Sequence, residues 1–92
     1  MKAMKIHIVQ PVCGRSVGEL VKERRAIVRY IETMFCVDVE VAIRPAAANM
    51  IVMAHGWAED PGCVQQLEAA QERGQGFLDM DAPAIVFKAV EE

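Results

Sequence analysis

The stretch MIVMA (Met50–Ala54) is the feature that most restricts how this chain can fold. All five of its side chains are apolar, whereas a strand with one face in water alternates apolar and polar residues. A short continuous apolar run is typical of a strand that is covered on both faces. Such strands belong to α/β proteins, in which helices pack on both sides of a parallel sheet.

The segments around this run predict two helices and four further strands. Ser16, with Glu19 three residues later, forms a capping box, and apolar residues then recur at helical spacing through about Phe35. Asp60 caps a second helix with a proline in its first turn, and Gly74 is placed to end it. The predicted strands are Met4–Val9, Val37–Ile43, Met50–Ala54, Gly76–Leu78 and Ala84–Val90.

The order strand, helix, strand, strand, helix, strand predicts an α/β fold, with a small, mainly parallel sheet flanked by helices, of the Rossmann or flavodoxin-like kind. Residues 1–92 contain no linker or repeat, so we expect a single domain. One joint is short: about six residues separate Ile43 from Met50, whereas a parallel crossover needs about a dozen. Either these strands pair antiparallel, or one is irregular, or an element is exchanged with a second chain.

Composition excludes several classes of function. The chain has 53% hydrophobic residues and a net charge of −3, which fits a globular protein and argues against binding to nucleic acid. No apolar run approaches the roughly 20 residues of a membrane span, and no signal peptide precedes the first predicted strand. The three cysteines are widely spaced, without a CxxC pair, which indicates reduced thiols in a cytoplasmic protein. We expect no cofactor.

The candidate site follows from the expected architecture. In an open α/β sheet, ligands bind beyond the carboxyl ends of the strands, near helix N-termini. Here that edge would carry Gln10–Arg15, His55–Trp57 and Asp60–Gln66. The glycines in these segments permit close backbone approach. Trp57 offers a ring for stacking a base or sugar, although a lone tryptophan in a small domain also serves simple packing.

Cysteine and histidine residues at the same edge suggest a second chemistry. Cys13, His55 and Cys63 would suit a Cys–His nucleophile or a zinc site, and Cys63 lies near a helix N-terminus, which lowers a thiol pKa. Their spacing matches no local metal motif, and cysteine is among the most buried residue types. We therefore favour no metal site.

Two motifs resemble the nucleoside 2-deoxyribosyltransferase-like family, including its small bacterial and phage relatives. The segment KIHIVQPVCGR is similar to Lys-Ile-Tyr-Ile-Ser-Gly-Pro, two variable residues, then Gly-Arg, with Gln10 in place of the glycine. The segment NMIVMAHGWAEDPGCVQQLEAAQERG is similar to Asp, an apolar run, Gly-Trp, Ser-x-Gly, and then Glu, Ala and Gly at intervals of four. The resemblance covers most of Lys5 to Leu78. It lacks a segment that relatives have between the second and third strands.

This resemblance implies the fold of a trimmed deoxyribosyltransferase whose catalytic positions are changed. The family nucleophile is a Glu that attacks the anomeric carbon of a nucleoside, and its position here is Gln66. The family aspartate, which assists proton transfer, corresponds to Asn49, and the family serine corresponds to Asp60. A carboxamide is a very poor nucleophile and does not exchange a proton near pH 7. Asp60 also repels a phosphate at that helix N-terminus.

The sequence therefore predicts a catalytically degenerate protein that binds a nucleoside or nucleotide derivative. A homodimer or higher oligomer is expected, because relatives complete their pockets at a subunit interface. One alternative is an active N-glycosidase or deoxyribosyltransferase that uses Glu59 or Asp60 as its acid. Another is a structural or interaction protein with a vestigial pocket. The residues expected to build the pocket are Pro11, Gly14, Arg15, Trp57, Asp60, Gly62 and Gln66.

Overall fold

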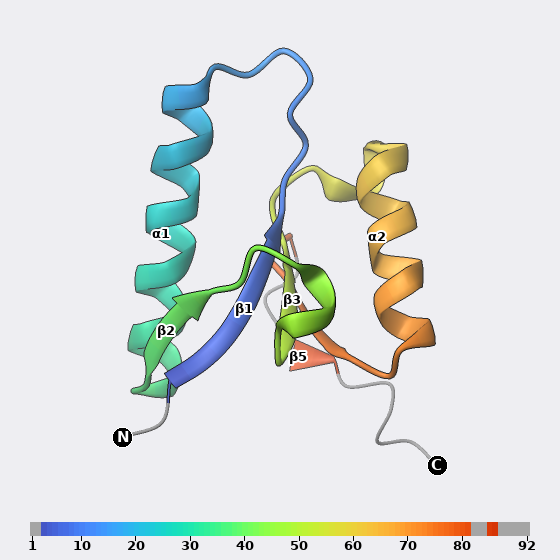
Figure 1. The fold of residues 1–92 in the computed structure, drawn as a ribbon. Coiled ribbons are helices and arrows are strands. Elements are labelled where there is room, and N and C mark those ends of the chain that lie inside the picture. The colour runs from blue at the N-terminus through green and yellow to red at the C-terminus, as the bar shows by residue number, and fades with distance from the viewer. Residues whose placement is uncertain (1–2, 82–84, 87–92) are drawn as a thin grey trace.

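The computed structural model describes residues 3–81 and 85–86, which form five strands, two α-helices and two short 3-10 helices (Figure 1). The strands are β1 (Ala3–Val9), β2 (Asp38–Val41), β3 (Met50–Met53), β4 (Gly76–Asp79) and β5 (Ile85–Val86). The helices are α1 (Val17–Phe35), η1 (Pro45–Ala47), η2 (Trp57–Glu59) and α2 (Pro61–Glu72).

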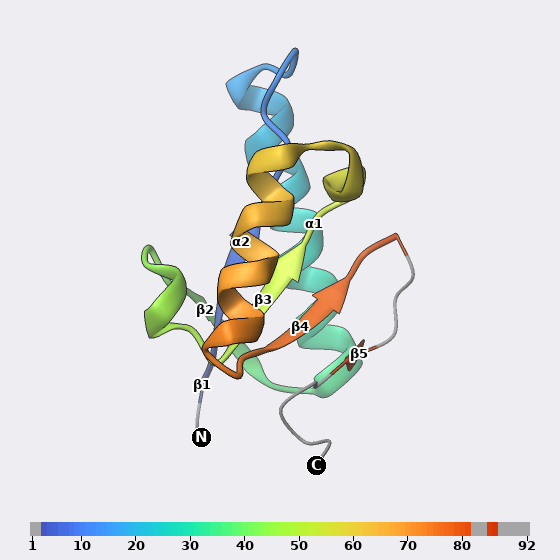
Figure 2. The same ribbon diagram turned by 90° about the vertical axis from the view of Figure 1, so that its right-hand side faces the viewer.

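The strands form one sheet in the order β2-β1-β3-β4-β5. The first four are parallel, and β5 pairs antiparallel with β4. Helix α1 covers one face of this sheet and α2 the other, as Figures 1 and 2 show. The predicted α/β fold with a mainly parallel sheet is confirmed. Of the predicted strand Ala84–Val90, the part beyond Ile85–Val86 lies outside the described residues.

Local capping chemistry sets the helix boundaries as the sequence predicts. The Ser16 side chain accepts from the Glu19 backbone, and the Glu19 side chain accepts from the Ser16 backbone, so the capping box is complete. Asp60 caps α2 by accepting a hydrogen bond from the Cys63 N–H. Helix α2 ends at Glu72, and Gly74 follows with φ +77°, a backbone conformation that favours glycine.

The apolar run in β3 is buried on both faces, which confirms the inference from MIVMA. Met50 and Val52 belong to the core under α1, whereas Ile51 and Met53 belong to the core under α2. All four side chains are at most 2% exposed. The central strand therefore joins two hydrophobic layers, one under each helix.

The short joint between β2 and β3 is explained by a stagger along β1. Strand β2 pairs with the first half of β1 and ends where Val41 lies beside Ile6. Strand β3 pairs with the second half and begins where Met50 lies beside Ile6, on the other side. The chain passes from one side of β1 to the other at the level of Ile6 and does not have to run back along the sheet before β3 begins. A short connection is therefore enough, although β2 and β3 are both parallel to β1. The predicted alternative of antiparallel pairing is wrong, because β1 lies between these strands.

The crossover itself is held by a side chain from beyond α2. The Gln75 amide donates to the backbone oxygens of Pro45 and Ala48, at 2.8 and 2.9 Å, and fastens η1 beside β1. Ile43 and Arg44 bend away from the strand, so the predicted strand Val37–Ile43 is shortened to Asp38–Val41. Consequently the second half of β1 has no β2 residue beside it.

Candidate functional site

A cavity of about 360 Å³ lies at the carboxyl end of β1, between the first turns of α2 and the side of α1. Its floor is the half of β1 that β2 leaves uncovered. Pockets that bind small molecules typically measure about 300–1,000 Å³, so this one lies at the small end of that range. The lining residues are His7, Ile8, Val9, Gln10, Val12, Arg24, Asp60, Gly62, Cys63 and Gln66.

Three of the predicted pocket residues meet in this cavity: Asp60, Gly62 and Gln66. They lie at the cap and in the first two turns of α2, which the Asp60 cap positions. A Cβ on Gly62 would lie 3.2 Å from Asp60 Oδ1, so the cap leaves little room for a larger residue. Gln66, in the second turn of the helix that begins at this cap, also lines the cavity.

Two polar cavity residues, His7 and Arg24, were missed as site residues by sequence reasoning. Nδ1 of His7 lies 2.9 Å from the Ala42 carbonyl, which can only accept, so Nδ1 donates and Nε2 is the free ring nitrogen. Side chains alternate along a strand, so His7 lies on the opposite face of β1 from Ile6 and Ile8. This alternation is the sequence signal that could have identified His7. Arg24 lies on the charged face of α1, and no sequence signal distinguishes it from the other arginines there.

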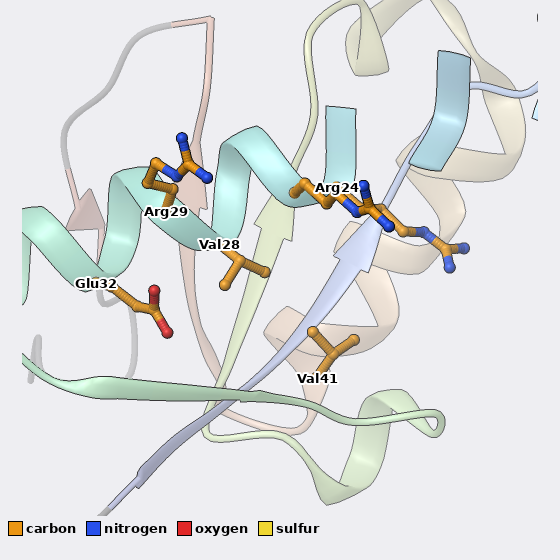
Figure 3. A pocket seen from close by; sticks show the side chains of 6 residues that line it. Arg24, Val28, Arg29, Glu32 and Val41 are labelled. Atoms are coloured by element: carbon orange, nitrogen blue, oxygen red, sulfur yellow. The ribbon is translucent and has the colours of Figure 1, made fainter. Parts of the chain in front are cut away.

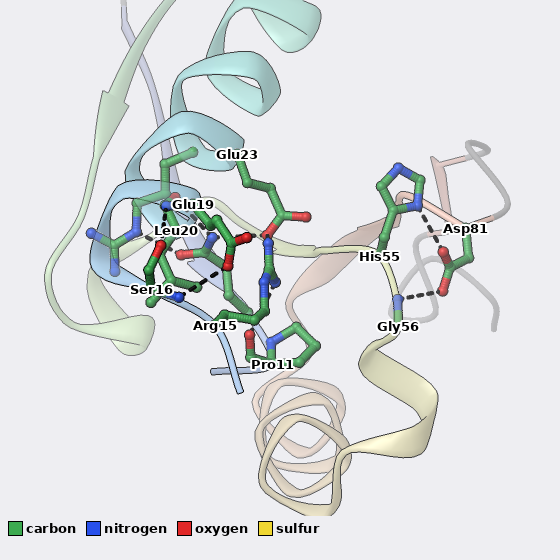
Figure 4. A network of polar contacts seen from close by, with 11 residues as sticks. Pro11, Arg15, Ser16, Glu19, Leu20, Glu23, His55, Gly56 and Asp81 are labelled. Carbon is green, nitrogen blue, oxygen red and sulfur yellow. Dashed lines mark hydrogen bonds and ion pairs between the residues drawn. The ribbon is translucent and has the colours of Figure 1, made fainter. Parts of the chain in front are cut away.

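A network of polar side chains fixes the mouth of the cavity (Figure 4). The Gln10 amide donates to the Glu23 carboxylate at 2.9 Å and accepts from Arg24 Nε at 2.7 Å. Arg15 forms an ion pair with Glu23 at 2.9 Å and donates to the Pro11 carbonyl. Gln10 thus sets the position of Arg24, whereas Arg15 ties the β1–α1 loop to α1 and is not one of the cavity-lining residues.

The remaining predicted site residues lie outside the cavity. Gly14 has φ +75° in the exposed loop before α1. Trp57 packs against the core under α2, and its Nε1 donates to Asp79 at 2.8 Å. Asn49 accepts from the Lys5 N–H at the amino end of β3, the opposite end of that strand from the cavity. The positions that the resemblance pairs in catalysis are therefore separated.

His55 and Asp81 form a second polar contact at the carboxyl edge, beyond β3 and β4 (Figure 4). His55 Nδ1 lies 2.8 Å from Asp81 Oδ1, and the Gly56 N–H donates to Oδ2 at 3.0 Å. The hydrogen bond from His55, and then that from Gly56, lowers the pKa of the Asp81 carboxyl. Both side chains are exposed, so the contact organises a surface loop.

We expect the Asp81 titration to depend on His55. Because the folded-state pKa of Asp81 is lowered, the contact contributes to stability above the unfolded-state pKa and is lost as the pH falls through the folded-state pKa. Carboxyl-carbon NMR should show this pKa rising toward its ordinary value in His55→Ala. His7→Ala serves as the control and should leave the titration in place. An unchanged Asp81 titration in His55→Ala would contradict the assignment.

The structure does not support the Cys–His nucleophile or the zinc site that the sequence suggests for Cys13, His55 and Cys63. Cys63 is 3% exposed, and burial, followed by the Asp60 charge, raises the pKa of its thiol to about 11. A protonated thiol is a poor nucleophile and a poor metal ligand. Cys13 is exposed in the loop before α1. Across residues 3–81 and 85–86, no three His, Cys, Asp or Glu side chains gather as a metal-binding group.

The cavity offers hydrogen-bonding groups and one carboxylate, that of Asp60. Asp60 is the single acid among its lining residues, and one of its oxygens is engaged by the Cys63 N–H. Gln66 can donate and accept hydrogen bonds, and Arg24 keeps its terminal N–H groups beyond the bond that it makes to Gln10. Such a set favours recognition of a polar, hydrogen-bonding ligand.

No protein-family model, curated protein or solved structure matches this chain. Within the part of the chain that the structure describes, neither helix has the length and apolar character needed to cross a membrane.

Proposed function

We propose that this protein binds a nucleoside or nucleoside derivative in the cavity beside Gln66, without cleaving it. The observation that carries the proposal is the presence of Gln66, Gly62 and Asp60 together in the wall of one cavity. These positions match the nucleophile turn of the deoxyribosyltransferase-like family that the sequence resembles. An amide at the nucleophile position keeps the hydrogen-bonding shape and removes the chemistry.

The topology supports a ligand at this place. The chain leaves β1 toward β2 on one side, and leaves β3 toward β4 on the other. In doubly wound sheets, such a reversal opens a crevice at the carboxyl ends of the two strands, where ligands bind. The strand order β2-β1-β3-β4 is that of flavodoxin-like sheets, although η1 replaces the usual helix between β2 and β3.

The lining residues fit the edges of a nucleobase. The Gln66 side chain has an NH2 group that donates and a carbonyl oxygen that accepts hydrogen bonds. These groups complement the adjacent acceptors and donors on the edge of a base. The apolar side chain of Val12, which is 60% exposed, provides surface for its ring. A phosphate is better placed near Arg24 than near Asp60, because the Asp60 carboxylate repels it.

The test measures affinity and base release together. A panel of nucleosides and deoxynucleoside monophosphates is screened by thermal shift, and the best ligand is titrated by calorimetry. Gln66→Ala should weaken binding about tenfold, the effect of losing about 1.4 kcal/mol of hydrogen bonding. Glu68→Ala, on an exposed residue of α2 outside the cavity lining, is the matched control and should bind like the parent.

Chromatography of the same mixtures distinguishes the other functions. Free base above the level of the Gln66→Ala control would overturn the binding-only proposal in favour of an N-glycosidase. Absence of a shift with every ligand would overturn it in favour of a structural protein. Asn49 lies at the far end of β3, so we expect Gln66→Glu with Asn49→Asp to release no base.

A further inference from the structure

Three adjoining hollows in the surface form one groove around the uncovered edge of β1. The cavity beside Gln66 and a smaller hollow of about 180 Å³ share the lining residues His7, Ile8 and Arg24. The smaller hollow shares Arg24 and Val41 with a hollow of about 340 Å³ between α1 and β2 (Figure 3). The groove therefore runs from Gln66, past the end of β2, to the side of α1.

The α1 end of this groove carries three arginines. Arg24 lines all three hollows, whereas Arg25 and Arg29 line the hollow beside β2, together with one acid, Glu32. Arg25 and Arg29 lie four residues apart and are therefore neighbours on the helix surface. From Arg24 to Arg29 the helix rises about 7.5 Å, so the positive charge extends along the groove and is not confined to one point.

The charges of these arginines are not balanced by ion pairs. Within residues 3–81 and 85–86, no carboxylate lies close enough to pair with Arg24, Arg25 or Arg29. Glu23, one residue before Arg24, pairs instead with Arg15 at 2.9 Å. Like charges four residues apart also destabilise a helix. A chain with a net charge of −3 thus gathers three cations beside one groove, which favours an anionic ligand.

The two ends of the groove differ in charge, and this difference sets the direction of a ligand. Asp60 lines the cavity together with Gln66, whereas Arg25 and Arg29 line the hollow beside β2. The carboxylate repels a phosphate, and guanidinium groups bind phosphate oxygens through paired N–H donors. A ligand with its base beside Gln66 therefore directs its phosphates toward α1.

The middle of the groove fits a sugar. His7 lines both the cavity and the smaller hollow, so it lies where the two meet. Because Nδ1 donates to the Ala42 carbonyl at 2.9 Å, the neutral ring keeps Nε2 as an acceptor. An acceptor suits a sugar hydroxyl, which donates, and does not suit a phosphate oxygen. The order of groups along the groove is thus that of a nucleotide: base, sugar, phosphate.

We propose that the groove binds a nucleoside diphosphate or triphosphate, with its base beside Gln66 and its sugar at His7. Its phosphates then lie along α1, at Arg24, Arg25 and Arg29. The position of the base rests on the proposed function, whereas the phosphate site rests on the arginines. A single phosphate at Arg24 would leave the other two arginines without a partner, so the ligand carries more than one.

Calorimetry with a phosphate series tests the phosphate site. Adenosine, guanosine, cytidine and thymidine are titrated beside their 5′-mono-, di- and triphosphates. For a base that binds, affinity should rise at least about tenfold from the nucleoside to the diphosphate. Arg24→Gln should remove most of this gain and keep the affinity for the nucleoside. Lys22→Gln, which removes a charge from an exposed residue of α1 outside the groove, is the matched control and should bind every ligand like the parent. A diphosphate that binds no tighter than its nucleoside would overturn the proposal.

Inorganic triphosphate separates this inference from the proposed function, because it has no base. It should bind the parent, and the double variant Arg25→Gln with Arg29→Gln should weaken this binding at least about tenfold. Gln66→Ala should leave it unchanged. Binding of inorganic triphosphate without binding of any nucleoside or nucleotide would overturn the proposed function and support the phosphate site. Equal binding to the parent and the double variant, or no binding to the parent, would overturn the phosphate site.

Discussion

Replacing Ile31 by alanine should lower the free energy of unfolding by about 3 kcal/mol. Ile31 is fully buried in α1 and belongs to the core between this helix and the sheet. Truncation removes its transfer free energy and leaves a cavity that neighbours in regular structure fill only in part. For a domain of this size, the melting temperature should fall by more than about 10 °C.

Circular dichroism during thermal and urea unfolding measures this effect. Val21→Ala is the matched control, because Val21 lies on the same helix but is 39% exposed. It should change stability by less than about 1 kcal/mol. A loss below that value for Ile31→Ala would mean that α1 is not packed on the sheet as described.

Replacing Trp57 by phenylalanine should cost about 2 kcal/mol of folding stability. The phenylalanine ring preserves the packing against the core under α2, but it removes the hydrogen bond from Nε1 to the Asp79 carboxylate. Hydrogen bonds to charged groups contribute more than neutral ones. Urea unfolding followed by circular dichroism is the measurement, because Trp57 is the single tryptophan and its fluorescence is lost.

The same variant separates a structural role from a binding role for Trp57. Since Trp57 does not line the cavity beside Gln66, the affinity of Trp57→Phe for the best nucleoside should match the parent. A double-mutant cycle with Asp79→Ala should show a coupling of at least about 1 kcal/mol. Loss of nucleoside affinity without loss of stability would instead support the stacking role that the sequence suggests.

Local chemistry made the secondary structure predictable. The Ser16–Glu19 capping box, the Asp60 cap and the apolar run of β3 act within a few residues, and the structure confirms each of them. Burial on both faces of β3 follows from its composition alone. These features suffice to predict α/β layering, because an apolar strand requires a helix on each side.

Properties that depend on register were beyond the sequence. The stagger of β2 and β3 along β1 depends on which residues of three strands lie side by side, and a single chain does not encode this in its spacing. The same stagger leaves the second half of β1 without β2 beside it, which exposes the floor of the cavity and makes His7 one of its lining residues. Trp57 and Asn49 were predicted near Gln66, but hydrogen bonds to Asp79 and Lys5 hold them elsewhere.

The pairing of β1 also has a consequence for how this protein is made. β1 precedes both of its partners, so a ribosome releases it long before they exist. The first half of β1 pairs only after Asp38–Val41 has been synthesised, and its second half only after Met50–Met53 has been synthesised. Helix α1 requires only local hydrogen bonds and its own cap, so it is able to form in the interval. The nascent chain therefore carries an unpaired apolar strand beside a finished helix, which is the stage most exposed to aggregation during synthesis.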